Sequence, residues 1–403
     1  MSNFKTIEEF DLEGKTVLLR ADLNVPVQNG EVSDTTRIDR LQTTVHYLQK
    51  QGAKTLILSH YGRPKGQKNP DFSLAFLAPV LTTQWGVDVN FADDCIGDTV
   101  TKAVDKMNNG DFTLLENVRF YPGEEANDAE FTAQLAAAGD IYINDAFSTS
   151  HRAHASTEGL AHILPTGAGF LMSAELNALN EALESPERPV MALVGGAKVS
   201  TKLSVLNNIV KKVDYLVLGG GMANTFMFSQ GTDIGDSLCE KDMADEAIRI
   251  FNTAKEHGCE IILPRDITVI SGDLVANAPH VVVQRDGFAP DQGSVDAGPQ
   301  SVAFIQETLK SCKTILWNGP LGVFELKPFD KGTNAVAQTV AELTKSGQLV
   351  SVAGGGDTVS ALENAGVARD FTYISTAGGA FLEWLEGKTL PGVAALTANK
   401  KAA

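Results

Sequence analysis

Short apolar runs alternate with longer amphipathic stretches along most of this chain of 403 residues. The runs are rich in Val, Ile and Leu, and the stretches between them repeat apolar residues at helical spacing. This alternation is typical of parallel sheets whose strands are joined by right-handed helical crossovers. The expected strands are residues 16–20, 55–59, 112–115, 141–144, 190–194, 214–218, 260–263, 280–284, 314–317, 348–353 and 372–375.

Three of the longer stretches carry clear helix patterns. Residues 35–51, 240–257 and 332–346 each repeat apolar residues on one face, and each is followed by a glycine that suits a helix C-terminus. In the first of them the apolar face consists of Ile38, Leu41, Val45 and Leu48. We therefore predict helices over these three ranges.

The number of expected strands points to two domains, because eleven strands exceed one comfortable sheet. Residues 173–185 form a helical pattern that Pro186 and Pro189 break, and a new strand begins at once. We therefore predict an α/β protein of two doubly wound, Rossmann-like parallel-sheet domains joined by a helix, with a cleft between them. One large α/β domain is the alternative. The predicted parts are an N-terminal domain over 1–172, a connecting helix and hinge over 173–188, and a C-terminal domain over 189–389.

Charge and composition exclude several classes of protein. The formal net charge is −17, whereas a protein that binds duplex DNA needs a basic face. The longest nearly apolar stretch, residues 189–196, is far shorter than the ~18 residues of a membrane-spanning helix. The N-terminus lacks the apolar core of a secretory signal, and the four cysteines are scattered. We therefore expect a cytoplasmic protein without nucleic-acid or membrane partners.

In the first half of the chain, cationic and polar residues follow the expected strands. Open parallel sheets bind ligands outside the carboxyl ends of their strands, so these positions are informative. They carry Arg20, Asp22, Asn24, Arg37, His60, Arg63, Arg119 and Arg152. The planar guanidinium of arginine suits carboxylate and phosphate groups. The five arginines predict a site for a small polyanion, although Asp22 also suits a turn and His60 a buried structural position.

In the second half, the strand ends carry glycine instead. The segments are GGAK at 195–198, GGG at 219–221, NGP at 318–320, GGGDT at 354–358 and AGG at 377–379. Such turns let backbone amides approach a phosphate, which predicts a nucleotide site. Lys198 and Lys202 are expected on one face of a helix, where they bind phosphate or merely face solvent. Asp357 suits Mg²⁺, or alternatively a helix N-cap.

Several nucleotide and catalytic motifs do not occur. The chain contains no GxxxxGK[ST], no complete GxGxxG after a strand and no GxSxG. A P-loop enzyme, a nicotinamide-dependent dehydrogenase and an α/β-hydrolase are therefore disfavoured. A non-enzymatic protein that closes on a polyanion remains a rival, but it would not need Lys198, Lys202 and the GGGDT turn together.

The motifs as a set resemble one family. RADLNVP, SHYGRP, LLENVRF, SHRAHAS, GGAKVSTK, GGGMANTF, WNGPLGVFE, GGGDT and STAGGAFLE follow one another between residue 20 and about 392. In this order they are similar to the successive signatures of the phosphoglycerate kinases. The resemblance implies a glycolytic, monomeric kinase. Its N-terminal domain would bind 3-phosphoglycerate or 1,3-bisphosphoglycerate, its C-terminal domain would bind ADP or ATP with Mg²⁺, and residues 390–403 would pack on the N-terminal domain.

The resemblance also implies roles for individual residues. Substrate contacts are implied at Asp22, Leu23, Asn24, Arg37, His60, Tyr61, Gly62, Arg63, Arg119 and Arg152. Nucleotide contacts are implied at Lys198, Lys202, Gly219, Gly220, Asn318, Glu325, Gly355, Gly356, Asp357 and Thr358. Glu325 would accept from the ribose hydroxyls unless it is a surface acid, and Asp357 would bind the metal. The residues implied in the transfer itself are Arg37, Lys198, Gly378 and Gly379.

Three positions depart from the family's pattern. Ala377 stands where the first of three glycines is expected, Ser148 where a glycine is expected, and Phe381 where a smaller residue is expected. An alanine needs a backbone φ that its Cβ tolerates, so the contribution of position 377 depends on its conformation. None of the three is a charged catalytic residue, and we expect the activity to be retained.

The implied reaction agrees with what the sequence lacks. The carboxylate of 3-phosphoglycerate is itself the nucleophile, so no Ser–His or Cys–His pair is required. Catalysis must come from positioning and from cations on the transferring phosphoryl group. Because the two substrates belong to different domains, we expect hinge closure that excludes water, with hinges near residues 173–190 and 375–392.

Overall fold

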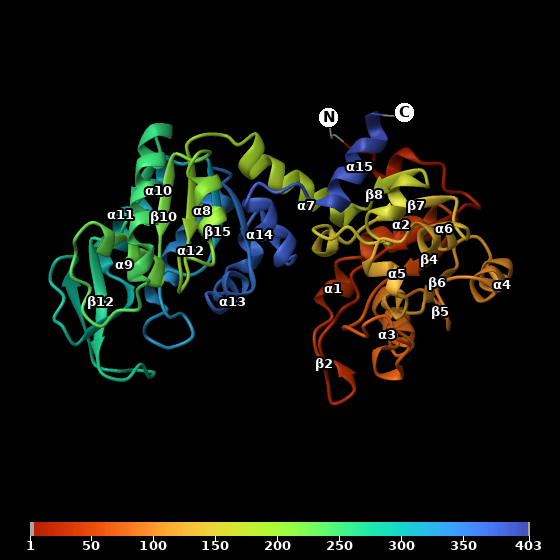
Figure 1. Cartoon of the computed structure of the whole chain (residues 1–403), viewed down its shortest axis with the longest axis horizontal. Coiled ribbons are helices and arrows are strands. Elements are labelled where there is room, and N and C mark those ends of the chain that lie inside the picture. The colour runs from red at the N-terminus through yellow and green to blue at the C-terminus, as the bar shows by residue number, and fades with distance from the viewer. Residues whose placement is uncertain (1–3, 402–403) are drawn as a thin grey trace. The chain divides into compact units, whose positions relative to one another are not determined.

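The chain folds around two parallel sheets, each six strands wide (Figure 1). The structure is a computed structural model that describes residues 4–401, with side chains described through residue 398. One unit consists of residues 4–177 together with 389–401, and the second consists of residues 178–388. These are the two α/β sheets that the strand–helix alternation predicts. The border falls within helix α7 (Phe170–Leu179), which continues as the π-helical turn η6 (Asn180–Glu184).

The sheet of the first unit is parallel throughout. Its strand order is β5-β6-β4-β1-β7-β8. The strands are β1 (Thr16–Arg20), β4 (Lys54–Leu58), β5 (Val89–Ala92), β6 (Phe112–Leu115), β7 (Ile141–Asn144) and β8 (Thr166–Ala168). Strand β1 lies in the middle of the sheet. The next strands, β4, β5 and β6, are added on one side of it, and β7 and β8 are added on the other side. The strand order therefore changes direction between β1 and β7. We call this position the reversal point, and such sheets bind ligands there.

Short helices, turns and one hairpin surround this sheet. The helices are α1 (Thr36–Asp39), α2 (Gln42–Lys50), α3 (Leu77–Trp85), α4 (Asp98–Lys106), α5 (Pro122–Glu125), α6 (Ala129–Ala136) and α15 (Pro391–Lys401). The 3₁₀ turns are η1 (Ile7–Glu9), η2 (Pro70–Phe72), η3 (Val118–Phe120), η4 (Phe147–Thr149) and η5 (Gly159–His162). The hairpin joins β2 (Val27–Gln28) to β3 (Glu31–Val32). Helix α15 packs on this unit, where the Gly392 amide donates to the Ser150 carbonyl at 2.9 Å.

The helix expected over 35–51 is two helices in the structure, α1 and α2. The Leu41 amide donates to the Ile38 carbonyl at 3.1 Å, a tighter bond between residues three apart that interrupts the regular ladder. The apolar face is as predicted, because Ile38, Leu41, Val45 and Leu48 are all buried. The burial pattern of the helix is therefore readable from sequence even where its continuity is not.

The sheet of the second unit is also parallel throughout, with the order β11-β10-β9-β15-β16-β17. Its strands are β9 (Val190–Val194), β10 (Tyr215–Leu218), β11 (Glu260–Ile262), β15 (Thr314–Asn318), β16 (Val350–Gly354) and β17 (Tyr373–Ser375). Numbered within this sheet, the order is 3-2-1-4-5-6, the dinucleotide-fold arrangement. Its direction reverses between β9 and β15, which marks the expected ligand position.

Longer helices join the strands of the second unit. They are α8 (Leu203–Ile209), α9 (Gly220–Ser229), α10 (Ala244–His257), α11 (Pro299–Ser311), α12 (Lys331–Lys345), α13 (Gly356–Asn364) and α14 (Gly379–Leu385), with the 3₁₀ turns η7 (Lys241–Met243) and η8 (Ala368–Asp370). The helices expected over 240–257 and 332–346 are confirmed within a few residues as α10 and α12. Gly258 and Gly347 follow them with φ of 73°, a left-handed conformation that glycine adopts readily.

One expected strand belongs to a different kind of sheet. Residues 280–284 form β13, which pairs with β12 (Asp266–Ser271) in an antiparallel sheet that β14 (Gln292–Ala297) completes. The run of β-branched residues predicts the strand but not its direction. Only residues 272–279 join β12 to β13, whereas a parallel crossover needs about a dozen residues or more. The short connection therefore imposes antiparallel pairing.

Strand β1 is buried on both faces. Leu18 lies in one hydrophobic cluster and Leu19 in another on the opposite face of the sheet, and all five residues of the strand are buried. This two-sided burial is why the strands appear in the sequence as continuous apolar runs instead of alternating patterns. Among the described residues, no helix has the length and apolar character to cross a membrane.

Candidate active site

The polar loop after β1 meets α1 and the loop after β4. Arg37, on α1, donates from Nη1 to the Asp22 carboxylate at 2.8 Å and to the Asn24 carbonyl at 3.0 Å. The Asn24 side-chain oxygen accepts from the Gly62 amide at 3.0 Å. Gly62 has a φ of +60°, and a Cβ there would clash with the Phe72 ring. Four of the residues predicted to contact substrate therefore lie together beside the β1–β7 reversal point.

The loop residues Leu23 and Tyr61 present mainly their backbone to this region. The Leu23 side chain is buried in the core, and its amide donates to the Ser59 hydroxyl at 3.0 Å. The Tyr61 ring packs edge-on against Phe76, with ring centres 5.3 Å apart. Their side chains therefore stabilise the two loops that carry Asp22 and Gly62.

Arg20 differs from the other arginines at the strand ends. Its side chain is buried, and its guanidinium donates to the Ala21 carbonyl, to the Ser156 hydroxyl at 2.9 Å and to His60 Nδ1 at 3.1 Å. A guanidinium only donates, so His60 Nδ1 accepts and the ring proton resides on Nε2. Burial, reinforced by Arg20 and Arg119, lowers the pKa of His60 well below its usual value. His60 is therefore a neutral N–H donor, and Arg20 is a structural member of the cluster, not a free anion ligand.

Arg119 and Arg152 provide positive charge beside His60. Arg119 is buried, donates to the Gly62 carbonyl at 2.9 Å and pairs with Glu125 at 3.3 Å. Burial and then Arg152 lower the pKa of Arg119 to about 10. Arg152 is half-buried, Arg63 is exposed, and neither has a carboxylate within 4 Å among the described residues. The cluster is thus rich in uncompensated positive charge within an acidic protein.

Glu124 is the buried acid of this cluster, and the motif analysis did not single it out. Its carboxylate accepts from the Ser156 amide at 2.9 Å and the Ser156 hydroxyl at 2.6 Å, and lies 3.7 Å from His154 Nδ1. Burial raises the pKa of Glu124, while Arg20 opposes that shift. Its position in the sequence LLENVRFYPGEE gives no signal beyond a surface-like acidic pair, so only packing reveals its role.

In the second unit, the glycine-rich turns after β9, β10 and β15 pack backbone against backbone. The Gly195 amide donates to the Asn318 carbonyl at 3.0 Å, and the Gly220 amide donates to the Leu321 carbonyl at 2.9 Å. A Cβ on Gly195 would clash with the Pro320 carbonyl, and one on Gly219 would lie 2.8 Å from the Leu321 Cα. Glycine is therefore required for these turns to converge at the reversal point.

Lys202 is anchored at the same reversal point. Its ammonium donates to the Gly195 carbonyl at 2.7 Å and to the Asn318 carbonyl at 3.1 Å. Burial lowers the pKa of Lys202 to about 8, and the nearby charge of Asp357 acts in the opposite direction. The lysine therefore lies between the carboxyl ends of β9 and β15, within electrostatic reach of Asp357.

The expectation that Lys198 and Lys202 share a helix face is wrong. Helix α8 begins at Leu203, Lys202 is its N-cap residue, and Lys198 lies in the preceding loop with its side chain exposed. The Thr201 hydroxyl donates to the Lys198 carbonyl at 2.8 Å, and the Ser200 hydroxyl donates to Glu240 at 2.6 Å. These side-chain hydrogen bonds pair polar groups of the segment that precedes α8, which lacks the backbone hydrogen bonds of a helix.

The GGGDT turn begins α13 beside Asn318. The Thr358 hydroxyl is buried and accepts from the Gly319 amide at 2.7 Å, while Asn318 Nδ2 donates to the Gly354 carbonyl at 2.7 Å. The Asn318 side-chain oxygen is buried without a hydrogen-bond partner in the structure. Gly355 has a φ of +98°, and Gly356 and Asp357 follow it in exposed positions. The turn therefore presents backbone amides and one carboxylate to solvent.

The remaining predicted residues lie on loops around these turns. Glu325 is exposed in the segment between β15 and α12. Gly378 precedes α14 with a φ of +51°, and Gly379 is the first residue of that helix. No group of three or more His, Cys, Asp or Glu side chains suited to a metal occurs in the described part of the chain. Asp357 is accordingly a single carboxylate, which suits Mg²⁺ that is held mainly by nucleotide phosphates and water.

The structure accommodates the three departures from the family's pattern in different ways. Ala377 is buried and does not have a positive φ, so its Cβ introduces no backbone strain there. Phe381 is buried beneath Gly354, where a Cβ would lie 2.7 Å from its ring. The Ser148 hydroxyl donates to the Asp22 carboxylate.

Leu238 is a residue that the sequence analysis missed. It is a large apolar side chain with 55% of its surface exposed, and a Cβ added to Gly221 would lie 3.2 Å from its Cδ2 atom. An apolar side chain exposed beside the glycine turn after β10 is suited to pack against a nucleotide base. Nothing in the sequence around it signals this exposure.

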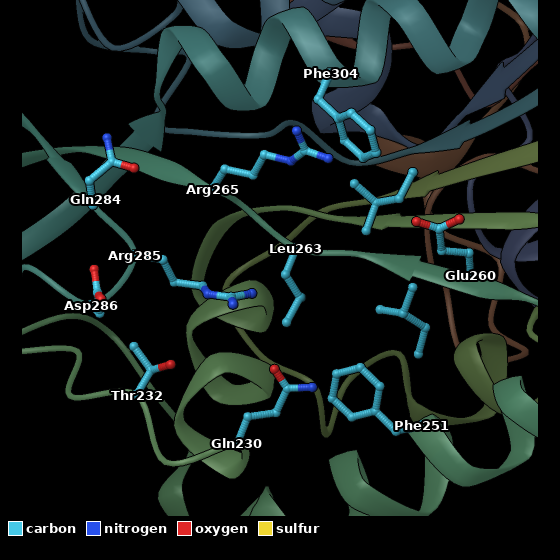
Figure 2. A pocket seen from close by; sticks show the side chains of 12 residues that line it. Gln230, Thr232, Phe251, Glu260, Leu263, Arg265, Gln284, Arg285, Asp286 and Phe304 are labelled. Carbon is cyan, nitrogen blue, oxygen red and sulfur yellow. The ribbon is translucent and has the colours of Figure 1, made fainter.

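A large hollow in the second unit lies away from these residues. It has a volume of about 500 Å³ and is lined along β11 by side chains such as Arg265, Arg285 and Phe251. Figure 2 shows the Arg265 guanidinium beside Phe304, with Arg285 reaching toward the middle of the hollow. None of the residues predicted from the motifs lines it. The candidate nucleotide site is therefore located by its strand ends and their chemistry, not by the size of a cavity.

Comparisons with known proteins agree with this arrangement. The family model described as phosphoglycerate kinase matches residues 7–388. The phosphoglycerate kinase of Rhodospirillum centenum is 58% identical over 395 residues, which cover 98% of this chain and 100% of that one. That of Methylobacterium radiotolerans is 57% identical over 400 residues, covering 99% and 100%. The solved structure of phosphoglycerate kinase from Coxiella burnetii matches with a TM-score of 0.91 at 40% identity, covering 98% of this chain and 99% of that one. The chain therefore belongs to the phosphoglycerate kinase family and is an enzyme with that family's activity.

Proposed function

We propose that the first unit binds 3-phosphoglycerate or 1,3-bisphosphoglycerate, that the second binds ADP or ATP with Mg²⁺, and that the phosphoryl group passes directly between them. One observation supports this division most strongly. The residues in contact beside the reversal points are charged and polar in the first unit, where Arg37 bonds to Asp22, and glycine-rich in the second, where Lys202 bonds to the Gly195 carbonyl. A small polyanion and a nucleotide are the ligands that these two surfaces suit.

In the first unit, Asp22 and Asn24 orient the glycerate. His60 Nε2–H, Arg63, Arg119 and Arg152 hold the phosphate that is not transferred, because a neutral donor among guanidinium groups suits a dianion. Arg37 binds the reacting carboxyl group of the substrate. Its ion pair with Asp22 holds it beside the glycerate position.

In the second unit, the glycine turns and Lys202 hold the nucleotide phosphates, and Lys198 reaches the transferring group from its exposed loop. Asp357 and the amides of Gly355 and Gly356 belong to the same turn. Asp357 would hold Mg²⁺, which supplies charge neutralisation on the phosphates. Gly219, Gly220 and Leu238 form the wall for the base, and Glu325 accepts from the ribose hydroxyls.

The chemical step needs no base. A carboxylate oxygen of 3-phosphoglycerate attacks the terminal phosphorus of ATP, and the bond to the bridging oxygen breaks with its electron pair leaving on ADP. Arg37 and Lys198 offset the charge on the transferring group, and the Gly378 and Gly379 amides orient it. In the opposite direction the same residues serve ADP and the acyl phosphate.

The two sets of residues belong to different units, so both substrates must bring the units together before transfer. We propose hinge movement at residues 173–190 and 375–392, with water excluded on closure. Small-angle scattering tests this step. A decrease in radius of gyration that requires both substrates is expected, and an unchanged radius with both bound would refute it. We also propose that the enzyme acts as a cytoplasmic monomer.

A trapping assay tests the activity and the division of roles. MgATP and 3-phosphoglycerate are incubated with hydroxylamine, which captures acyl phosphates, and ADP release is measured. Release that requires both substrates and Mg²⁺ is the expected result. Asp357→Asn should raise the Mg²⁺ concentration needed for half-maximal ADP release. Arg63→Ala should raise the 3-phosphoglycerate concentration needed for half-maximal release. If the two variants exchanged these effects, the assignment of ligands to units would be reversed.

A further inference from the structure

Ser148 and Asp22 meet at the reversal point of the first sheet. Strands β1 and β7 are parallel neighbours with Arg20 opposite Asn144, and the Asp145 amide donates to the Arg20 carbonyl at 2.9 Å. Asp22 follows β1 by two residues, and Ser148 lies in the 3₁₀ turn η4 directly after β7. The two loops therefore leave the sheet side by side, which brings residues 126 positions apart into contact.

The Asp22 carboxylate is held by three donors. Its Oδ1 atom accepts from the Asn24 amide at 3.1 Å. Its Oδ2 atom accepts from the Ser148 hydroxyl and from Arg37 Nη1, the latter at 2.8 Å. The Asp22 side chain is 12% exposed and that of Arg37 is 35% exposed. One donor to Oδ2 is thus a short side chain on a 3₁₀ turn, and the other is a long, partly exposed side chain.

We propose that Ser148 is a positioning residue, whose hydroxyl keeps the Asp22 carboxylate oriented independently of Arg37, its other partner at Oδ2. This inference rests on the proposed roles of Asp22 and Arg37. With glycine at position 148, Oδ2 would keep only the arginine, and movement of Arg37 would leave the carboxylate held by the Asn24 amide at Oδ1 alone. With serine, the orientation of Asp22 and the movement of Arg37 are independent.

Steady-state kinetics of Ser148→Ala test the proposal. We expect the KM for 3-phosphoglycerate to rise about five- to tenfold, because a hydrogen bond to a charged group is lost at a substrate-orienting residue. The KM for MgATP should stay within about twofold, since the nucleotide residues lie in the other unit. Ser148→Thr retains the hydroxyl and should restore the KM for 3-phosphoglycerate to within about twofold. A purely structural residue would not separate the two KM values in this way.

Ser150→Ala is the matched control. Ser150 lies next to the same turn, and among the described residues its hydroxyl bonds to the Ala146 carbonyl, at 3.5 Å, and not to Asp22. It should leave both KM values unchanged. An equal rise in Ser150→Ala, or an unchanged KM in Ser148→Ala, would overturn the proposal.

A double-mutant cycle separates this proposal from the role of Asp22 itself. Asp22→Asn should raise the KM for 3-phosphoglycerate, and adding Ser148→Ala to it should cause little further rise, because both changes act through one carboxylate. If Asp22→Asn leaves that KM unchanged, the role of Asp22 is refuted and the role of Ser148 with it. If Asp22→Asn raises it and the two effects simply multiply, Ser148 does not act through Asp22.

Discussion

Lys202→Met should stabilise the second unit at neutral pH. The Lys202 ammonium donates to two backbone carbonyls, and burial lowers its pKa from 10.5 to about 8. That fall corresponds to a cost of about 3 kcal/mol for keeping the side chain protonated in the folded protein. Loss of the two hydrogen bonds offsets about 1–2 kcal/mol of this gain. We therefore expect the free energy of unfolding to rise by about 2 kcal/mol at pH 7.

The pH dependence of this difference follows from the direction of the shift. In the unfolded chain Lys202 keeps its proton up to its ordinary pKa of 10.5, whereas in the folded protein it loses the proton near pH 8. Between these values the unfolded state binds more protons, so the wild-type protein gains stability as the pH rises. Methionine does not titrate. The advantage of the variant should therefore be complete below pH 8 and decline from pH 8 toward pH 10.

Urea unfolding of both proteins, measured between pH 7 and pH 10, provides the assay. Lys211→Met is the control, because Lys211 is exposed and makes no side-chain hydrogen bond in the structure. Its effect should stay within about 0.5 kcal/mol at every pH. Lys202→Met should also raise the KM for MgATP, which Lys211→Met should not. A destabilised Lys202→Met at pH 7, or a difference that is constant with pH, would refute the reasoning.

Three further predictions concern the first unit. Arg37→Ala should lower kcat roughly 10³-fold, as for other arginines that act on a transferring phosphoryl group, while calorimetry shows unchanged ATP affinity; a loss of tenfold or less would remove it from that role. Arg63→Ala should raise the KM for 3-phosphoglycerate without changing the free energy of unfolding, because the side chain is exposed; a changed KM for ATP alone would contradict this. His154→Gln should resist acid better than wild type. Burial and then Arg119 lower the pKa of His154 from 6.5 to about 4. As the pH falls through this range, the unfolded state takes up the proton first, so the stability of the wild-type protein decreases. Urea unfolding of both proteins at pH 7 and pH 5 tests the sign of this difference.

The strands were predictable where they are buried on both faces. Residues 16–20, 112–115, 141–144 and 190–194 are strands with the predicted bounds, because two-sided burial requires continuous apolar runs. Strands β5, β8, β12 and β14 were missed, although the edge strands β11, β13 and β17 were expected. β8 consists of Thr166, Gly167 and Ala168, whose small side chains give no hydrophobic signal. Apolar runs therefore identify central and edge strands alike, whereas a strand of small residues such as β8 gives no signal.

The order of strands within each sheet was not predictable from alternation alone. Both β4 and β7 pair with β1, and the sequence does not distinguish a neighbour on one side from a neighbour on the other. The chemistry at the strand ends located the ligand positions without that order. Every parallel strand of a sheet ends at the same edge, so polar residues that follow several strands lie along that one edge whatever the order.

Contacts between side chains of different loops lay beyond the sequence. Ser148 was noticed only as a departure, and its contact with Asp22 depends on how two loops leave neighbouring strands. Glu124 and Leu238 gave no signal, because a buried acid and an exposed leucine are unusual only with respect to their surroundings. The sequence therefore identified the residues that lie in glycine-rich turns or belong to the set of arginines after the strands. It did not identify residues that are distinguished only by how buried or exposed they are.

The ligand-free protein holds both sets of functional residues at an energetic cost. In the first unit, neighbouring arginines add to burial in lowering the pKa of Arg119, His60 and His154, which means that positive charges are held together against repulsion. In the second, Lys202 is half-buried, and among the described residues its ammonium donates to backbone carbonyls. An anion that binds at either site removes that cost. Relief of this destabilisation of the free protein therefore contributes to the free energy of binding. A chain of net charge −17 can therefore bind polyanions where cations gather, although acids such as Asp22 and Glu125 pair with some of these cations.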